Sequence, residues 1–287
     1  MRAWNSEKAF QEWKNGVREM TFPVDIVHLD FAETHFKNAI EFESGGTFAE
    51  AAKKDQGFSR AWSRLGYCYM TRNMEGFDDT LRAEAEEYTA RAVRMDPLNY
   101  DVHWDRAIYY QLTAKFDLAE EAFNRARELN DCNVDLIVEQ AELYINLGDH
   151  DHALKLLRKA GEFVHHDWFH WNFAWAYYFK ARLDPVFYDH ALDHIRAMHW
   201  QPGEPRYMYD VQLLKATIHA KLIELELASK SQQEPLRLIA KAHFQAGCTL
   251  YRPKISAWNK NDEDRWHKFD INEDRDHWLD GVELGLK

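Results

Sequence analysis

The chain has 287 residues, of which 46% are hydrophobic and 29% charged, a composition typical of soluble globular proteins. Its formal net charge of −12 argues against a general nucleic-acid or anionic-membrane surface, since both require a basic face. Three cysteines without paired spacing, the absence of a signal-like apolar core in MRAWNSEKAF, and the lack of any run of about 18 apolar residues predict a soluble, cytoplasmic protein.

The first fifty residues predict three helices. With 7 prolines, 12 glycines and few alternating β-branched residues in the whole chain, the protein is predicted to be all-α. Ser6–Thr21 forms a first helix in this interpretation. Asp30 would cap a second helix that Ser44-Gly45-Gly46 ends, and Thr47–Lys54 adds a short helical piece.

An internal repeat then follows. Small and aromatic residues recur with a spacing of 34, and two helices fit in each repeat. The matching pairs are Ala107 and Ala141, Tyr110 and Tyr144, Ala119 and Ala153, Phe123 and Leu157, and Ala126 and Ala160. Because one helical pair cannot bury its apolar side alone, such units are expected to stack into a superhelix with a concave face.

The flanking units depart from this spacing only in their turns. The preceding unit has Trp62, Leu65, Gly66 and Tyr69, and we expect a surface loop, TRNMEGFDDT, to absorb about seven extra residues. The following unit uses Ala174 and Tyr177, with an enlarged turn around Leu183-Asp184-Pro185.

Beyond Gln201-Pro202-Gly203 the pattern weakens. Arg206–Leu227 and Glu234–Gly247 are predicted to form a degenerate closing pair. We therefore expect a repeat domain over residues 1–250, clearest in 59–203, and a C-terminal extension, 251–287, that packs on the array and ends in a short helix, Asp276–Leu286.

The most aromatic stretch is His165–Lys180, HHDWFHWNFAWAYYFK. The repeat register assigns Phe173, Ala174 and Tyr177 to the inter-repeat core. The opposite face has four further aromatic residues, namely Trp168, Trp171, Trp175 and Tyr178. Because a helix that is apolar all round must be buried, this second face must be covered by something.

These motifs resemble tetratricopeptide repeats (TPRs) from about Asp30 to Gly247. GFSRAWSRLGYCY, DPLNYDVHW, the aromatic stretch and DHWLDGVELGLK are most similar to the arrays that follow bacterial class III adenylate or guanylate cyclase domains, or regulator domains. The resemblance implies an α-solenoid of about five to six helical pairs. It also implies a non-catalytic protein-interaction module in bacterial signalling, such as an adaptor, scaffold or regulatory subunit.

In this family, peptides usually lie in the concave groove, which the first helix of each pair lines. The register places seven apolar or aromatic residues there, namely Trp104, Ile108, Ile145, Trp168, Trp171, Trp175 and Tyr178. Asp101, Asp105 and Asp135 would repel a partner's carboxylate. The predicted partner is therefore a protein or peptide segment that is apolar or basic-amphipathic, with tryptophans as anchors.

Two alternatives remain open at this stage. The chain could be a structural or homo-oligomeric scaffold whose groove is filled by its own tail, which contains Trp258, Trp266 and Trp278. It could also be an enzyme or small-molecule sensor, for which a deep pocket with convergent polar groups would be needed.

The sequence predicts no catalytic residue, cofactor or metal. Phosphate-binding, dinucleotide-binding and hydrolase signatures are missing. His190 and His194 stand four residues apart near His165, His166, His170 and His199, but no Cys or acidic residue completes an evident zinc set. Asp270, Asn272 and Asp274 begin like a calcium loop, yet Arg275 stands where glycine is needed and Gly281 where the bidentate Glu should be.

Overall fold

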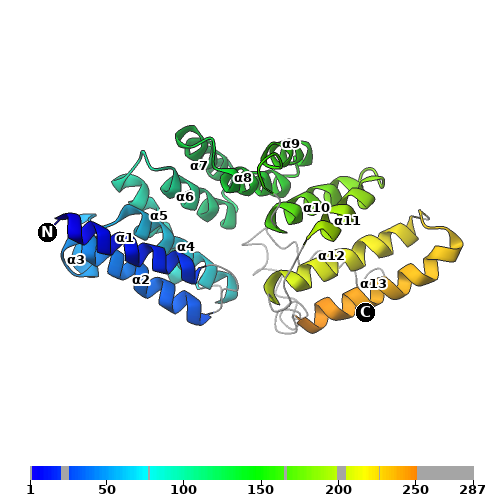
Figure 1. Cartoon of the computed structure of the whole chain (residues 1–287), viewed down its shortest axis with the longest axis horizontal. Coiled ribbons are helices and arrows are strands. Elements are labelled where there is room, and N and C mark those ends of the chain that lie inside the picture. The colour runs from blue at the N-terminus through cyan, green and yellow to red at the C-terminus, as the bar shows by residue number, and fades with distance from the viewer. Residues whose placement is uncertain are drawn as a thin grey trace. The chain divides into compact units, whose positions relative to one another are not determined.

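The structure is a computed structural model that describes residues 2–20, 26–76, 78–164, 167–198, 205–225 and 227–250. Within these residues the chain forms thirteen α-helices and no strand (Figure 1). They are α1 (Arg2–Glu19), α2 (Ile26–Ser44), α3 (Phe48–Lys54), α4 (Ser59–Gly76), α5 (Asp79–Met95), α6 (Tyr100–Leu112), α7 (Phe116–Leu129), α8 (Val134–Asn146), α9 (His150–Ala160), α10 (Asp167–Ala181), α11 (Phe187–Ala197), α12 (Pro205–Glu224) and α13 (Lys230–Leu250).

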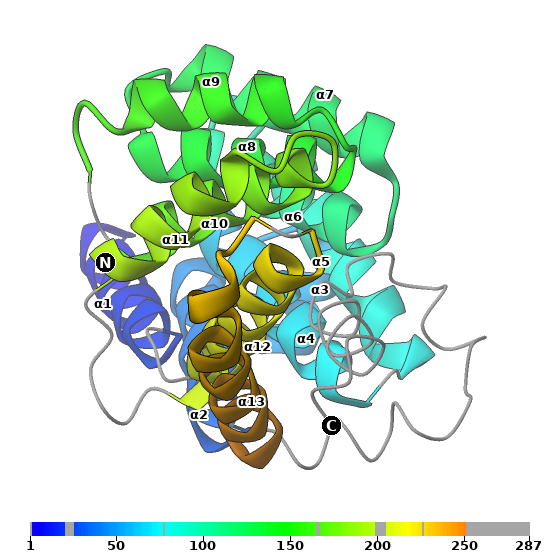
Figure 2. The same cartoon turned by 90° about the vertical axis from the view of Figure 1, so that its right-hand side faces the viewer.

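Neighbouring helices pair as hairpins. α4 packs on α5, α6 on α7, α10 on α11, and α12 on α13, and both views show the last two helices side by side (Figures 1 and 2). α8 and α6 begin 34 residues apart, at Val134 and Tyr100, and so do α9 and α7, at His150 and Phe116. The all-α architecture of paired helices predicted from the repeat is confirmed.

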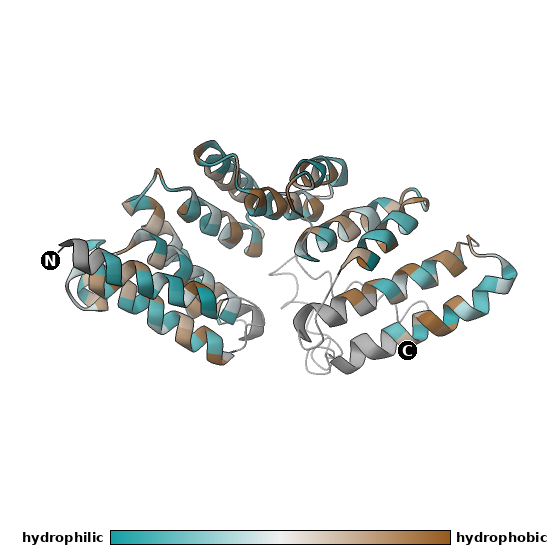
Figure 3. Cartoon of the chain, viewed as in Figure 1, coloured by the Kyte–Doolittle hydropathy of each residue, from teal (hydrophilic) through white to brown (hydrophobic). Residues whose placement is uncertain are grey.

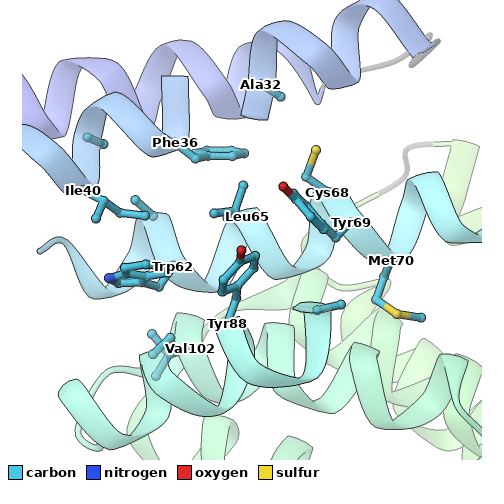
Figure 4. Close-up of a cluster of buried hydrophobic side chains, with 14 of the residues drawn as sticks. Ala32, Phe36, Ile40, Trp62, Leu65, Cys68, Tyr69, Met70, Tyr88 and Val102 are labelled. Carbon is cyan, nitrogen blue, oxygen red and sulfur yellow. The ribbon is translucent and has the colours of Figure 1, made fainter. Parts of the chain in front are cut away.

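The chain divides into two compact units, Met1–Leu136 and Ile137–Lys287, with the border inside α8. In the first unit the core lies among α2, α4, α5 and α6 (Figure 4). Phe36 and Ile40 of α2 face Trp62 and Leu65 of α4, and all four are fully buried. Gly66 of α4 allows the close approach of α5, because a β-carbon there would lie 2.5 Å from Thr89 Cγ2.

In the second unit each hairpin buries alanines where its helices meet. Ala153, Ala160, Ala174, Ala191 and Ala216 are all fully buried. Tyr144 of α8 stacks on His152 of α9, with ring centroids 3.9 Å apart. Hydrophilic and hydrophobic residues are interspersed along α12 and α13 (Figure 3), and exposed apolar residues include Leu238 and Ile239 on α13.

Some predicted helix ends match the structure, whereas α1 begins at Arg2 instead of Ser6, and α13 spans Lys230–Leu250 instead of Glu234–Gly247. α2 ends at Ser44, and Thr47 caps α3 through a capping box with Glu50. The turn after α10 contains Leu183-Asp184-Pro185, as predicted. The closing pair is also confirmed, as α12 and α13.

Two other local predictions were also wrong. Asp30 does not cap α2, which begins at Ile26, because the buried Leu29 and the Asp30–Arg72 ion pair (2.6 Å) both belong to the helix. The extra residues after α4 are not mainly a loop, since α4 continues to Gly76. This extension places Arg72 against α2, where its Nη1 donates to Glu33 Oε2 at 2.6 Å.

Several predicted features lie outside the described residues. They are the end of the first predicted helix at Thr21, His165, His166, His199, Gln201-Pro202-Gly203, and the whole of 251–287 with its tryptophans, its rejected calcium loop and its final helix.

Candidate functional site

In the first unit, ion pairs link the first helices of two successive hairpins. Arg60 and Arg64 of α4 pair with Asp101 and Asp105 of α6, the second pair at 3.4 Å. Ser63 also donates a hydrogen bond to Asp105 Oδ2. Two of the three aspartates that were predicted to repel a partner's carboxylate are therefore buried and paired with arginines.

Asp105 is the more deeply buried of these two carboxylates, with 1% of its side chain exposed. Burial raises the pKa of this carboxyl group, and Arg64 and Ser63 act in the opposite direction. Its charge depends on the two α4 residues, so Asp105 ties α6 to α4 and is not available to a ligand.

Aromatic side chains lie over the same arginines. Arg60 stacks on Trp13 of α1 at 4.9 Å, and Arg64 lies 5.7 Å from the Trp104 ring and 5.8 Å from that of Tyr67. Trp104 and Ile108 are half-buried. This set, Arg60, Arg64, Tyr67, Trp104 and Ile108, is called the first-helix face of the first unit below.

In the second unit the predicted aromatic face of α10 is packed inside the protein. Trp171, Trp175 and Tyr178 are 4%, 1% and 1% exposed. Trp171 and Trp175 meet edge to face at 5.4 Å, Trp175 stacks on Phe179 at 5.2 Å, and Tyr178 contacts Tyr188 of α11 at 6.1 Å. Trp168, at the start of α10, is half-buried.

The seven predicted groove residues thus fall into two groups. Ile145, Trp171, Trp175 and Tyr178 are buried, whereas Trp104, Ile108 and Trp168 reach the surface. In this conformation the four buried residues present no surface to a partner. The sequence required something to cover this face, because α10 has apolar residues all round, but it did not show whether a partner or the chain itself covers it.

The other side of α10 has a histidine–aromatic cluster. His170 Nδ1 lies 3.0 Å from His194 Nδ1 of α11, so the two rings share one hydrogen bond. The His194 ring stacks on Phe173 at 4.3 Å. Burial and the neighbouring His170 lower the pKa of His194 to about 4, so the His194 ring is neutral at pH 7.

A second histidine pair joins α12 and α13. His219 and His243 stack with centroids 5.9 Å apart, and burial lowers the pKa of both, that of His243 to about 4. Within the part of the chain that the structure describes, no group of three His, Cys, Asp or Glu side chains is arranged to hold a metal ion.

Cys68 of α4, between Tyr67 and Tyr69, is a buried packing residue. Its Sγ donates a hydrogen bond to the Leu29 carbonyl at 3.4 Å, and burial raises the pKa of the thiol to about 12. A thiol held protonated in this way is a poor nucleophile.

Two surface cavities accompany these features. One, of about 350 Å³, lies among α5, α6 and α7, and the other, of about 360 Å³, lies beside the turn after α10, near Leu183, Tyr188 and Leu225. No helix among the described residues is long and apolar enough to cross a bilayer.

Comparison with known proteins finds similarity at the level of structure. No family model and no curated protein matches the sequence. Solved structures with a similar arrangement include PilF from Pseudomonas aeruginosa, with 16% identity and a TM-score of 0.48, covering 82% of this chain and 92% of that one. TTC0263, a TPR protein of Thermus thermophilus, has 18% identity and a TM-score of 0.39, covering 66% and 99%. MamA has 18% identity and a TM-score of 0.41, covering 66% and 93%.

Proposed function

We propose that this chain is a non-catalytic protein-interaction module that binds a segment of a partner through the first-helix faces of its hairpins. The observation that supports this most directly is the half-exposed pair Trp104 and Ile108 on α6. Trp104 stands beside Arg64, whose charge is already neutralised by Asp105.

The chemistry of this face favours an apolar or basic-amphipathic segment. Trp104 and Ile108 supply apolar contact area, and tryptophan is among the residue types that most often dominate binding energy at interfaces. The net charge of −12 attracts basic segments over long range. In the second unit, Trp168 offers a similar half-exposed anchor.

The proposal also includes a cellular compartment and a biological role. Three cysteines without paired spacing are compatible with a reducing compartment, and we place the protein in the cytoplasm. We propose bacterial signalling as its setting, on the sequence resemblance to arrays that follow cyclase or regulator domains.

The test is affinity capture with matched variants. Trp104→Ala/Ile108→Ala removes the anchors, and Leu98→Ala/Leu147→Ala removes two exposed leucines that are not on the first-helix face. A partner retained by the wild type and the leucine variant, but lost by the Trp104/Ile108 variant with unchanged helicity, supports the proposal. Equal recovery by all three proteins contradicts it.

A second candidate is a structural or homo-oligomeric scaffold whose aromatic face is satisfied from within. The burial of Trp171, Trp175 and Tyr178 favours it. Removing the chain from Pro253 onward distinguishes the two candidates. New apolar dye binding or precipitation indicates that the tail covers apolar surface, whereas an unchanged, soluble protein favours an open binding face.

A further inference from the structure

The cavity among α5, α6 and α7 is lined by three arginines, one from each helix. Its volume is about 350 Å³, which is large enough for one or two amino-acid side chains. Arg94 comes from α5, His103, Arg106 and Tyr110 from α6, and Arg125 from α7. Glu121 is the single acidic residue in the lining. The glutamates that pair with these three arginines, Glu86, Glu87 and Glu128, are not part of the lining, so guanidinium groups predominate among its charged residues.

Arg106 is a fixed element of this lining. Its Nη1 donates to the Glu86 carbonyl at 2.9 Å and to Thr89 Oγ1 at 2.8 Å. The guanidinium group also stacks on Tyr110, 4.3 Å from the ring centroid. A planar cation held by both hydrogen bonds and a ring keeps its position when a ligand arrives.

The other two arginines are able to change partners. Arg94 pairs with Glu87 at 3.1 Å, and Arg125 pairs with Glu128 at 2.9 Å. All four of these side chains are more than 40% exposed, and such surface pairs contribute little to stability. A guanidinium group also has five N–H donors, so each arginine can add a carboxylate without losing its present one.

The remaining walls are apolar. Ala90 and Val93 of α5 line the cavity together with Leu118 and Ala122 of α7, and Leu118 is 42% exposed. An occupant that fits this lining therefore has a carboxylate for the arginines and an apolar group for the walls.

We propose that this cavity is a second docking site, which takes an acidic partner segment with an aliphatic side chain next to Asp or Glu. The aliphatic side chain would lie between Val93 and Leu118, and the carboxylates would meet Arg94 and Arg125. The site shares no residue with the first-helix face, so the two surfaces are able to hold two segments at once. It does not depend on the function proposed for the first-helix face.

The test measures fluorescence anisotropy with a labelled peptide of repeating Asp-Leu-Glu and a matched peptide of repeating Asn-Leu-Gln. We expect the acidic peptide to bind, with an affinity that falls as salt is raised, and the amide peptide to bind at least about tenfold more weakly. Arg94→Ala/Arg125→Ala should weaken binding of the acidic peptide about tenfold or more, and Ala90→Glu should do the same by placing a negative charge in the cavity.

The matched control removes two cations elsewhere. Arg158→Ala/Lys159→Ala lowers the net charge equally through exposed residues of α9, and should change the affinity less than about twofold. An equal loss in the control and in the Arg94/Arg125 variant shows general charge attraction and overturns the proposal. So does a wild type that binds both peptides alike, or neither.

Discussion

α6 and α10 occupy corresponding places in their hairpins, yet they are held by different forces. Each is the first helix of a hairpin, and each has the alanine and tyrosine of the repeat, Ala107 and Tyr110 in α6 and Ala174 and Tyr177 in α10. On its remaining surface α6 uses carboxylates paired with arginines of α4, whereas α10 uses indole and phenol rings.

This difference shows which positions the repeat constrains. The close approach of two helices requires a small residue at one position and a large flat residue beside it, and both hairpins have them. The other face of the first helix is not fixed by that requirement. In α6 it is polar enough to leave Trp104 half-exposed, while in α10 three aromatic residues are buried there.

The largest expected effect on stability comes from the buried aromatic face of α10. Replacing Trp175 with alanine removes a side chain that is 1% exposed and contacts Trp171, Tyr178 and Phe179. We expect a loss of about 3–5 kcal/mol in the free energy of unfolding, measured by urea titration followed by circular dichroism. Trp168→Ala, at the half-buried start of the same helix, is the matched control and should have a much smaller effect. Equal losses would show that α10 is not held by its buried rings.

Burial of Trp175 also marks where sequence-based prediction stops. The 34-residue spacing was enough to predict the hairpins and the alanine contacts, because helix packing repeats with the sequence. It did not show whether the second face of α10 meets water, since that depends on segments distant in sequence. The ion pairs between α4 and α6 could not be predicted for a similar reason, because Arg60 and Asp101 lie in different hairpins.

Local sequence patterns predicted one helix start correctly and another wrongly. Thr47 and Glu50 form a capping box within four residues, so the start of α3 could be predicted from the local sequence. Asp30 has the chemistry of a cap, but pairing with Arg72, 42 residues away, and burial of Leu29 continue the helix through it. Long-range contacts therefore override a cap that the local sequence allows.

The second prediction concerns the ion pair between Arg64 of α4 and Asp105 of α6. Arg64→Ala leaves the buried carboxylate of Asp105 without its cation, and we expect a loss on the order of 2–3 kcal/mol in unfolding free energy at pH 8. Asp105 has a pKa above its ordinary value in the folded protein, so its ionisation opposes folding as pH rises. The deficit of the variant should therefore shrink as pH falls toward the carboxyl pKa.

Arg64→Ala/Asp105→Asn separates the ion pair from the arginine's packing. The double variant should be more stable than Arg64→Ala alone, because the uncompensated charge is gone. A double variant that is less stable than either single variant would show that packing of the arginine over Trp104, and not the ion pair, holds α6 to α4.

The smallest effect tests the histidines on the other side of α10. The pKa of His194 is about 4 in the folded protein and about 6.5 in an unfolded chain, so the unfolded state binds the proton first as pH falls. The contribution of His194 to stability is therefore fully present above pH 7 and is lost progressively as the pH falls from about 7 toward 4. Solvent screening at this partly exposed ring limits the loss to on the order of 1–2 kcal/mol.

His194→Asn keeps a group that is able to hydrogen-bond with His170 but removes the titration. His170, His190 and Asp193 are the charged or titratable neighbours that act on His194, and Asp193 opposes the other two. The variant should lose less stability than the wild type between about pH 7 and pH 5, whereas His190→Asn, at an exposed position of α11, should behave nearly as the wild type does. A pH slope unaffected by His194→Asn would instead point to the other histidines whose pKa is lowered by burial, namely His150, His219 and His243.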